Sequence, residues 1–278
     1  MGHDEGTMRG DGGVELFEQW WRPDAREIRA EVAIVHGFGE HGGRYLNIVH
    51  RLVPAGYAVY ALDLRGHGRS PGQRGHVDRW TEYREDVGAF VRDVAGREPG
   101  RPLFLMGHSM GGLIVLEYAE QHPEGLRGVI ASGPLLAQPG ISPVKLALGR
   151  IISRVYPRFS LDAGLDVTAI SRDPAVVEAY RKDPLVHGRG TARLSTEIAG
   201  AQARVLAGAA NWTLPLLVIH GAADRLAPAV GSRTFFERVP ASVDKERDEI
   251  PGGAHEPHND TSQQQALDIL QGWLDRHA

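Results

Sequence analysis

A serine flanked by glycines is the first feature of the sequence that could do chemistry. Gly107, Ser109 and Gly111 form a Gly-x-Ser-x-Gly pattern that follows an apolar run and precedes a helical one. At a turn from strand to helix, the glycines allow a sharp bend that leaves the serine hydroxyl exposed. Such a hydroxyl can attack a carbonyl carbon, so the pattern predicts Ser109 as the nucleophile of an acyl transfer.

A serine nucleophile needs a base, and the base needs a carboxylate that orients it. Asp224 stands just past the apolar run 215–220, as the chain order serine, acid, histidine requires. Two histidines, His255 and His258, come after the turn-forming Pro-Gly-Gly 251–253. His255 is the favoured base because it comes first after the turn, and His258 remains the alternative. The competing interpretations are that Asp224 only forms a turn and that His255 and His258 are only surface residues.

The tetrahedral intermediate of acyl transfer carries an oxyanion, which two backbone N–H groups can stabilise. One donor is expected from Met110, the residue after the nucleophile. The other is expected from the loop 36–41 that follows an early strand, and Phe38 is the predicted donor.

Metal and phosphate chemistry have weaker signals. His255-Glu-Pro-His258 is one residue short of the H-E-x-x-H pattern, so the two histidines would not share one face of a helix. The glycine-rich run 63–70 lacks the Gly-Lys-Ser/Thr of a phosphate-binding loop. Neither a metal nor an organic cofactor is expected.

Alternating strand and helix patterns must position these residues. Apolar runs predict buried strands at 57–63, 103–107, 127–132 and 215–220, and helical patterns lie at 45–55, 79–95, 110–122, 230–239 and 262–276. This alternation predicts an α/β fold with a mostly parallel sheet flanked by helices. Residues 14–21 and 30–36 are expected to form two paired leading strands.

The alternation is interrupted for about eighty residues after Gly133. We expect a helical cap inserted over 134–213, with helical patterns at 142–159 and 191–210, between core segments 9–133 and 214–278. Residues 1–8 are expected to be a disordered N-terminus or a tag, because Met8 could also start the chain.

The first cap helix has two interpretations. Its apolar residues follow helical spacing and three arginines recur on another face: Val144, Leu148, Ile151, Ile152 and Val155, with Arg150, Arg154 and Arg158. A lid that meets a lipid surface fits this pattern. A helix packed on the core with a solvated arginine face fits it equally well.

Composition excludes several function classes. The 278 residues include 31 basic and 35 acidic ones, a net charge of −4, and no long basic block that would indicate nucleic-acid binding. The chain has no cysteine, so disulfides and thiolate chemistry are excluded. Neither a membrane-spanning run nor a signal peptide is evident, and a soluble, cytoplasmic protein is expected, with peripheral contact to a lipid surface as an option.

Five segments together resemble the monoacylglycerol lipase family of α/β hydrolases. They are HGFGEHGGRY (36–45), DLRGHGRSPGQRG (63–75), GHSMGG (107–112), SRDPAVVEAYRKDPLVH (171–187) and VIHGAADRLAP (218–228), in this order. The resemblance extends from about His36 to the end of the chain. Its cap segment is the most informative, since many hydrolases share the core.

The resemblance implies a function and a set of site residues. The implied reaction is hydrolysis of monoacylglycerol to fatty acid and glycerol, with a small lipid as substrate and no obligate protein partner. The implied site contains the nucleophile, acid and base, the two oxyanion donors, and a glycerol pocket: Ser109, Asp224, His255, Phe38, Met110, Glu40, Arg44, Tyr180 and His258. Alternatively, Glu40 and Arg44 only brace the oxyanion loop. The alternative functions are a general carboxylesterase or lysophospholipase of the same fold and a catalytically inactive binding protein.

Overall fold

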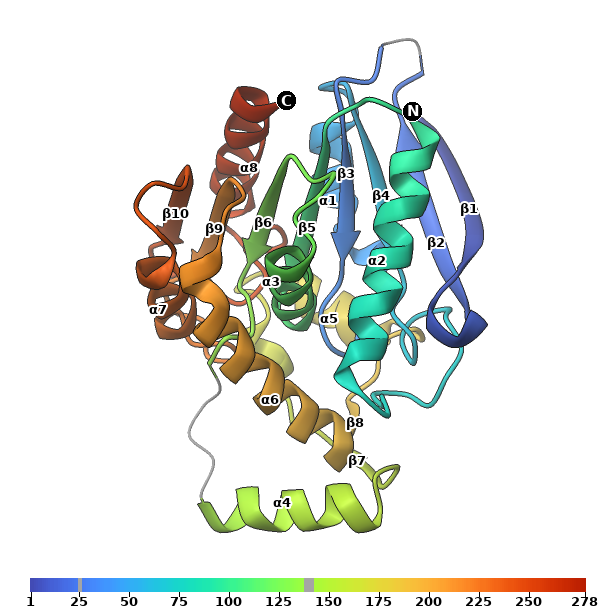
Figure 1. Ribbon diagram of the computed structural model, residues 1–278, viewed down its shortest axis with the longest axis vertical. Helices are drawn as coiled ribbons and strands as arrows, with labels where there is room; N and C mark the ends of the chain where they lie inside the picture. The colour runs from blue at the N-terminus through green and yellow to red at the C-terminus, as the bar shows by residue number, and fades with distance from the viewer. Residues whose placement is uncertain (25–26, 138–142) are drawn as a thin grey trace.

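An eight-stranded sheet forms the centre of the molecule (Figure 1). The structure is a computed structural model that describes residues 1–24, 27–137 and 143–278, with the backbone alone for 143–148. The strands are β1 (Gly2–Arg9), β2 (Glu15–Arg22), β3 (Ala30–Val35), β4 (Tyr57–Leu62), β5 (Leu103–His108), β6 (Gly128–Ser132), β9 (Leu216–Gly221) and β10 (Lys245–Ile250). They lie in the order β1-β2-β4-β3-β5-β6-β9-β10. Within this eight-stranded sheet, β1–β2 and β2–β4 are antiparallel and the other five pairs are parallel, so the predicted mostly parallel α/β fold is confirmed.

Helices cover both faces of the sheet because the central strands are apolar on both sides. Along β3, Ala33 and Val35 face one hydrophobic core, whereas Val32 and Ile34 face the other. The first core also contains side chains of α2 (Trp80–Arg97), α3 (Met110–Gln121), α6 (Ala192–Gly208) and α7 (Val230–Arg238); the second contains those of α1 (Leu46–Leu52) and α8 (Gln263–His277). Short 3-10 turns lie at η1 (Asp11–Gly13) and η2 (Gly42–Tyr45).

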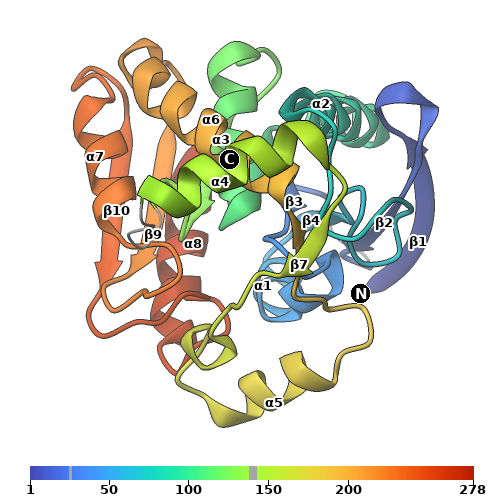
Figure 2. The ribbon, with the colours of Figure 1, turned by 90° about the horizontal axis from the view of Figure 1, so that it is seen from below.

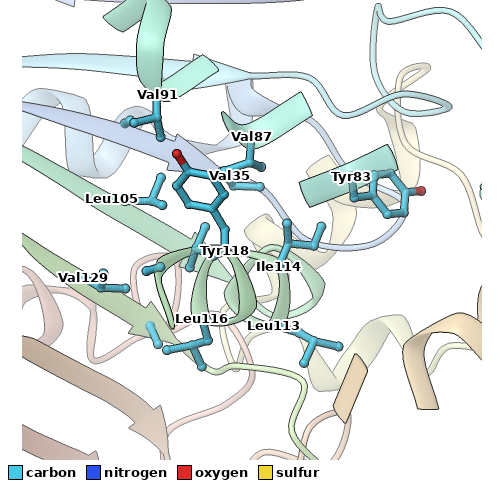
Figure 3. Close-up of a cluster of buried hydrophobic side chains, with 14 of the residues drawn as sticks. Val35, Tyr83, Val87, Val91, Leu105, Leu113, Ile114, Leu116, Tyr118 and Val129 are labelled. Carbon is cyan, nitrogen blue, oxygen red and sulfur yellow. The ribbon is translucent and has the colours of Figure 1, made fainter. Parts of the chain in front are cut away.

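Helix α3, which begins directly after Ser109, is the most deeply buried helix of the core. All residues from Met110 to Ala119 are buried. Figure 3 shows Ile114 and Tyr118 of α3 facing Val87 of α2, with strand side chains alongside. The helix that follows the nucleophile is therefore held on several sides.

The inserted segment lies between β6 and β9. It contains α4 (Pro143–Val155), β7 (Ser160–Asp162), η3 (Val167–Ala169), α5 (Pro174–Lys182), β8 (Arg189–Thr191), α6 and η4 (Ala209–Asn211). Helix α4 packs on α6, and Figure 2 shows it crossing the outside of the molecule. The predicted helices 142–159 and 191–210 correspond to α4 and α6, whereas α5 was not predicted. Residue 142 and the side chains of Val144 and Leu148 lie outside the described residues.

Two expectations about the N-terminal region are wrong. Residues 1–8 were expected to be a disordered N-terminus or a tag, but all of them except Met1 belong to β1, which pairs along its whole length with β2. The strands β2 and β3 were expected to pair with each other, but β4 lies between them and pairs with both. The connection from β3 through α1 returns the chain to this intermediate position.

Candidate active site

Ser109 occupies a strained turn between β5 and α3. Its φ of 53° makes it the only non-glycine residue with positive φ in the described part of the chain. The flanking glycines permit this turn: a Cβ on Gly107 would lie 2.4 Å from the carbonyl oxygen of Gly111, and one on Gly111 would lie 2.2 Å from that of Val35. Backbone strain of this kind is typical of functional sites. The predicted strand–turn–helix context of Ser109 is thus present.

Asp224 and His255 are joined by a short hydrogen bond. Nδ1 of His255 donates to Oδ2 of Asp224 at 2.7 Å, and both side chains are buried. The N–H groups of Leu226 and Ala227 donate to the other oxygen, Oδ1, at 2.8 and 2.9 Å. This bonding fixes the imidazole with its second nitrogen, Nε2, free for another partner. The structure therefore brings together the predicted acid and the favoured base.

Asp224 and His255 each stabilise the charged form of the other. Burial acts to raise the pKa of Asp224, but His255, together with hydrogen bonds from His220, His255 and the backbone, holds it well below its ordinary value. Burial acts to lower the pKa of His255, but the charge and hydrogen bond of Asp224 outweigh this effect and raise it. A proton on the imidazole is therefore stabilised by the carboxylate beside it.

The loop that carries Phe38 lies against the serine. A Cβ built on Gly37 would lie 3.1 Å from Cβ of Ser109. The loop is held by Glu40, whose Oε1 accepts the N–H of Gly37 at 2.7 Å. Phe38 and Ser109 line the same cavity, while Met110 is fully buried as the first residue of α3. The assignment of their N–H groups to an oxyanion hole stays a prediction.

A buried polar network adjoins this loop. Arg44 donates to Oε2 of Glu40 at 2.7 Å and to both carboxylate oxygens of Glu256 at 2.7 and 2.8 Å. Its guanidinium lies over the ring of Tyr180, 4.5 Å from the ring centroid. Tyr45 donates to Oε1 of Glu40 at 2.8 Å. The network places two carboxylates and one guanidinium beside the candidate active site.

The predicted glycerol-pocket residues divide into two groups. Glu40 and Tyr180 line the cavity, whereas Arg44 and His258 are not among the described residues that line it. His258 stacks on the ring of Tyr45, with ring centroids 4.8 Å apart, and is buried behind the site. Burial lowers the pKa of His258, which favours its neutral form. The predicted acid, Asp224, is hydrogen-bonded to His255, the favoured base.

Sequence reasoning missed Glu256. This side chain lines the cavity next to His255 and forms an ion pair with Arg44. In the sequence it was considered only as part of the rejected metal pattern 255–258. Its position directly after the predicted base was the available signal. Among the residues that the structure describes, no group of three or more His, Asp or Glu side chains is arranged to hold a metal ion.

The cavity above Ser109 has a volume of about 940 Å³. Its core side includes Ser109, His255 and Glu40, and the inserted segment closes the other side. Most of the inserted segment's contribution is apolar and includes Ile152, Phe159, Leu161, Leu165, Leu194 and Ile198. The cavity therefore has a polar end beside the network, and its walls elsewhere are mostly apolar, with Asp162, Asp166 and Arg225 as charged exceptions.

Comparisons with known proteins place this geometry in a family. The Hydrolase_4 family model, described as Serine aminopeptidase, S33, matches residues 26–262. A monoacylglycerol lipase of Mycolicibacterium smegmatis is 40% identical over 275 residues, 98% of this chain and 97% of the relative. The chain belongs to the monoacylglycerol lipase family. It is a serine hydrolase by membership of that family.

Solved structures agree with the assignment to the monoacylglycerol lipase family. A monoacylglycerol lipase of Paleococcus ferrophilus is 36% identical and superposes with a TM-score of 0.87 over 95% of this chain and 100% of its own. A soluble variant of monoglyceride lipase from Saccharomyces cerevisiae, in complex with a substrate analog, is 27% identical and has a TM-score of 0.89. The match covers 98% of this chain and 95% of the yeast chain.

None of the helices in the described ranges is both long and apolar enough to span a bilayer.

Proposed function

We propose that the protein hydrolyses monoacylglycerol to a fatty acid and glycerol through an acyl-enzyme on Ser109. The observation that carries this proposal is one cavity that joins Ser109 and His255 to a polar network at one end and apolar cap walls at the other. A single acyl chain needs apolar walls, and a glycerol group needs polar partners. Relatives named as monoacylglycerol lipases support the same substrate.

In the first step, Oγ of Ser109 attacks the ester carbonyl carbon. Nε2 of His255 takes the hydroxyl proton, and Asp224 stabilises the imidazolium that forms. The N–H groups of Phe38 and Met110 hold the oxyanion. The carbon–oxygen bond to glycerol then breaks, and His255 returns its proton to the departing alkoxide oxygen, leaving an acyl-enzyme.

In the second step, water replaces glycerol. His255 removes a proton from the water as its oxygen attacks the acyl carbon, and the same two N–H groups hold the second oxyanion. When the bond to Oγ breaks, His255 returns the proton to Ser109 and the fatty acid is released. No step requires a metal ion or an organic cofactor.

We propose that the cap contacts the lipid surface that presents the substrate. Of the large hydrophobic side chains that are exposed in the described residues, most lie between positions 151 and 165: Ile151, Val155, Tyr156, Phe159, Leu161 and Leu165. Ile151 and Val155 are 60% and 66% exposed on α4, which also carries the exposed Arg150 and Arg154. Apolar side chains beside arginines are typical of helices that lie on an anionic lipid surface.

The lipid contact can be tested by replacing Ile151 and Val155 together with serine. The rate on monoacylglycerol in anionic phosphatidylglycerol vesicles, divided by the rate on dissolved p-nitrophenyl butyrate, is expected to fall roughly tenfold because two apolar side chains no longer enter the lipid. Val230→Ser is a matched control, since Val230 is 57% exposed on α7, outside the cap. An unchanged ratio in the double variant, or an equal fall in the control, would contradict the lipid contact.

The substrate assignment is tested by comparing rates on mono-, di- and triacylglycerol and on p-nitrophenyl butyrate. A clear preference for monoacylglycerol is expected, because the cavity offers one apolar path and one polar end. Hydrolysis of the p-nitrophenyl ester alone would favour a general carboxylesterase. Failure to hydrolyse any ester and to react with a fluorophosphonate would indicate an inactive binding protein.

A further inference from the structure

Two carboxylates line the polar end of the cavity, and one guanidinium forms ion pairs with both of them. Glu40 and Glu256 both line the cavity and are almost fully buried, at 3% and 2% exposure. Arg44 bonds to both carboxylates and is not among the described residues that line the cavity. A ligand in the cavity therefore meets the carboxylates before it meets the cation.

The hydrogen bonds of Glu256 leave one acceptor position free. Oε1 accepts one bond from Arg44, while Oε2 accepts one from Arg44 and one from Nδ2 of Asn259 at 2.9 Å. Each carboxylate oxygen can accept two bonds, so Oε1 retains capacity for a further donor. The hydroxyl of an alcohol can supply that donor.

Three of the five N–H groups of the Arg44 guanidinium donate to the two carboxylates. Burial acts to lower the pKa of Arg44, but Glu256 and Glu40 outweigh it and raise the pKa above its ordinary value. One cation between two carboxylates leaves a net negative charge at this end of the cavity. Arg225 does line the cavity, but it is 65% exposed and pairs with Asp166, which lines the cavity too. The charge of Arg225 is therefore already matched by the carboxylate of Asp166.

We propose that Glu256 is a specificity-determining residue that selects neutral, hydroxyl-donating alcohol groups and rejects anionic ones such as glycerol phosphate. Two buried carboxylates accept hydrogen bonds from a neutral polyol, and they repel a phosphate through charge at short range. This inference deepens the proposed function and rests on it for the position of the alcohol.

The test uses Glu256→Gln, which keeps the shape of the side chain and removes its charge. For wild type and variant, kcat/KM is measured on 1-oleoylglycerol and on 1-oleoylglycerol 3-phosphate in the same neutral detergent micelles. Each value is divided by the rate of the same preparation on p-nitrophenyl butyrate, which cancels any damage to the catalytic residues. The preference for the neutral ester over the phosphate ester is expected to fall roughly tenfold or more in the variant.

Further variants separate charge from structure. Glu256→Asp retains the charge and is expected to keep most of the wild-type preference. Glu40→Gln removes the other carboxylate and is expected to shift the preference in the same direction as Glu256→Gln. This variant provides the test if the Glu256 variants fold poorly. Glu246→Gln is the matched control, since Glu246 lies on β10 and pairs with Arg276 at the surface. An unchanged preference in Glu256→Gln, or equal losses in the Asp and Gln variants, overturns the inference.

The outcome for the inference is distinguishable from the outcome for the proposed function. If wild type does not cleave 1-oleoylglycerol, the proposed substrate is wrong. The same preference is then measured with the butyrate monoesters of glycerol and of glycerol phosphate. A wild-type enzyme that cleaves the phosphate ester as well as the neutral one contradicts the role of Glu256 in either case.

Discussion

Single residues at the candidate site can be argued from their chemistry. The carboxylate of Asp224 accepts from Nδ1 of His255 and from two backbone N–H groups. These bonds hold it charged and fixed before any substrate binds. The same carboxylate raises the pKa of His255 against the effect of burial. The acid therefore controls both the orientation and the basicity of the base.

Replacing Asp224 with asparagine should affect both properties. We expect kcat to fall roughly 10³- to 10⁴-fold, because the imidazole loses its orienting partner and the imidazolium its counter-charge. The residual activity should also show a shifted pH profile. His255 must be neutral to act as base, so activity rises with pH through its pKa. Without Asp224 that pKa falls, and the rising limb of kcat/KM should move to lower pH.

The control for this variant is Asp4→Asn, at an exposed position on the edge strand β1. It should retain the wild-type rate and pH profile. A rising limb that stays in place in Asp224→Asn, or moves to higher pH, would show that Asp224 does not set the pKa of the base.

At the scale of elements, the inserted segment is bonded directly to the loop that carries His255. The N–H groups of His255 and Glu256 donate to the carbonyl oxygens of Ala169 and Ile170 at 3.2 and 2.8 Å. Asp260 links the same two segments: Oδ2 accepts the N–H of Ala254 at 3.0 Å and Nε of Arg172 at 2.9 Å. The inserted segment therefore supports the position of the base.

This support predicts a kinetic effect of Asp260→Asn. Asp260 is 1% exposed, and its backbone and arginine bonds bring its pKa to about 2, against the opposing effect of burial. Weakening these bonds should lower kcat roughly tenfold with little change in KM, since His255 moves while the apolar walls stay in place. The free energy of unfolding should fall by about 1–3 kcal/mol.

The matched control for Asp260→Asn is Asp268→Asn, at an exposed position on α8. Steady-state kinetics and urea denaturation of both variants separate the two effects. A loss of stability in Asp260→Asn with kcat unchanged would show that Asp260 supports the fold alone.

Elements with apolar runs were predictable from the sequence, and the edges of the sheet were not. The strands β4, β5, β6 and β9 are covered on both faces, so burial imposes an apolar run on each. The edge strands β1 and β10 read GHDEGTMR and KERDEI, and charged residues on edges discourage pairing with other chains. Their polarity removes the pattern by which a strand is recognised. The order of β2, β4 and β3 depends on long-range packing, which local patterns do not contain.

The site, too, has residues that the sequence could predict and residues that it could not. Ser109, Asp224 and His255 follow strands or their turns, so motif and chain order sufficed to find them. Glu256 gains its role only when the fold brings Arg44 next to it, 212 positions away in the sequence. Contacts between such distant segments leave no local pattern.

At the scale of the whole molecule, one buried carboxyl links stability to pH. Glu31 on β3 is fully buried, and burial raises its pKa to about 7 against the opposing effects of Tyr60 and Arg22. In the unfolded chain this carboxyl releases its proton near its ordinary pKa of 4.5. Between these two values the folded state holds a proton that the unfolded state has lost. The free energy of unfolding should therefore fall as pH rises from about 4.5 to 7.

Glu31→Gln removes this dependence. The variant should be more stable than wild type at pH 8 by about 1–3 kcal/mol, and the difference should shrink towards pH 5. Urea denaturation at the two pH values measures it, with Glu15→Gln on the exposed part of β2 as control. A difference that does not depend on pH would contradict the role of Glu31.

The central claim for the whole molecule is that Ser109 carries the acyl group during hydrolysis of monoacylglycerol. The most direct measurement is the rate of fatty-acid release from monoacylglycerol by wild type and by Ser109→Ala. Wild type should turn over, and the variant should lose activity by roughly 10³-fold or more, because no other nucleophile replaces the serine hydroxyl. A Ser109→Ala variant that retains the wild-type rate would contradict the mechanism.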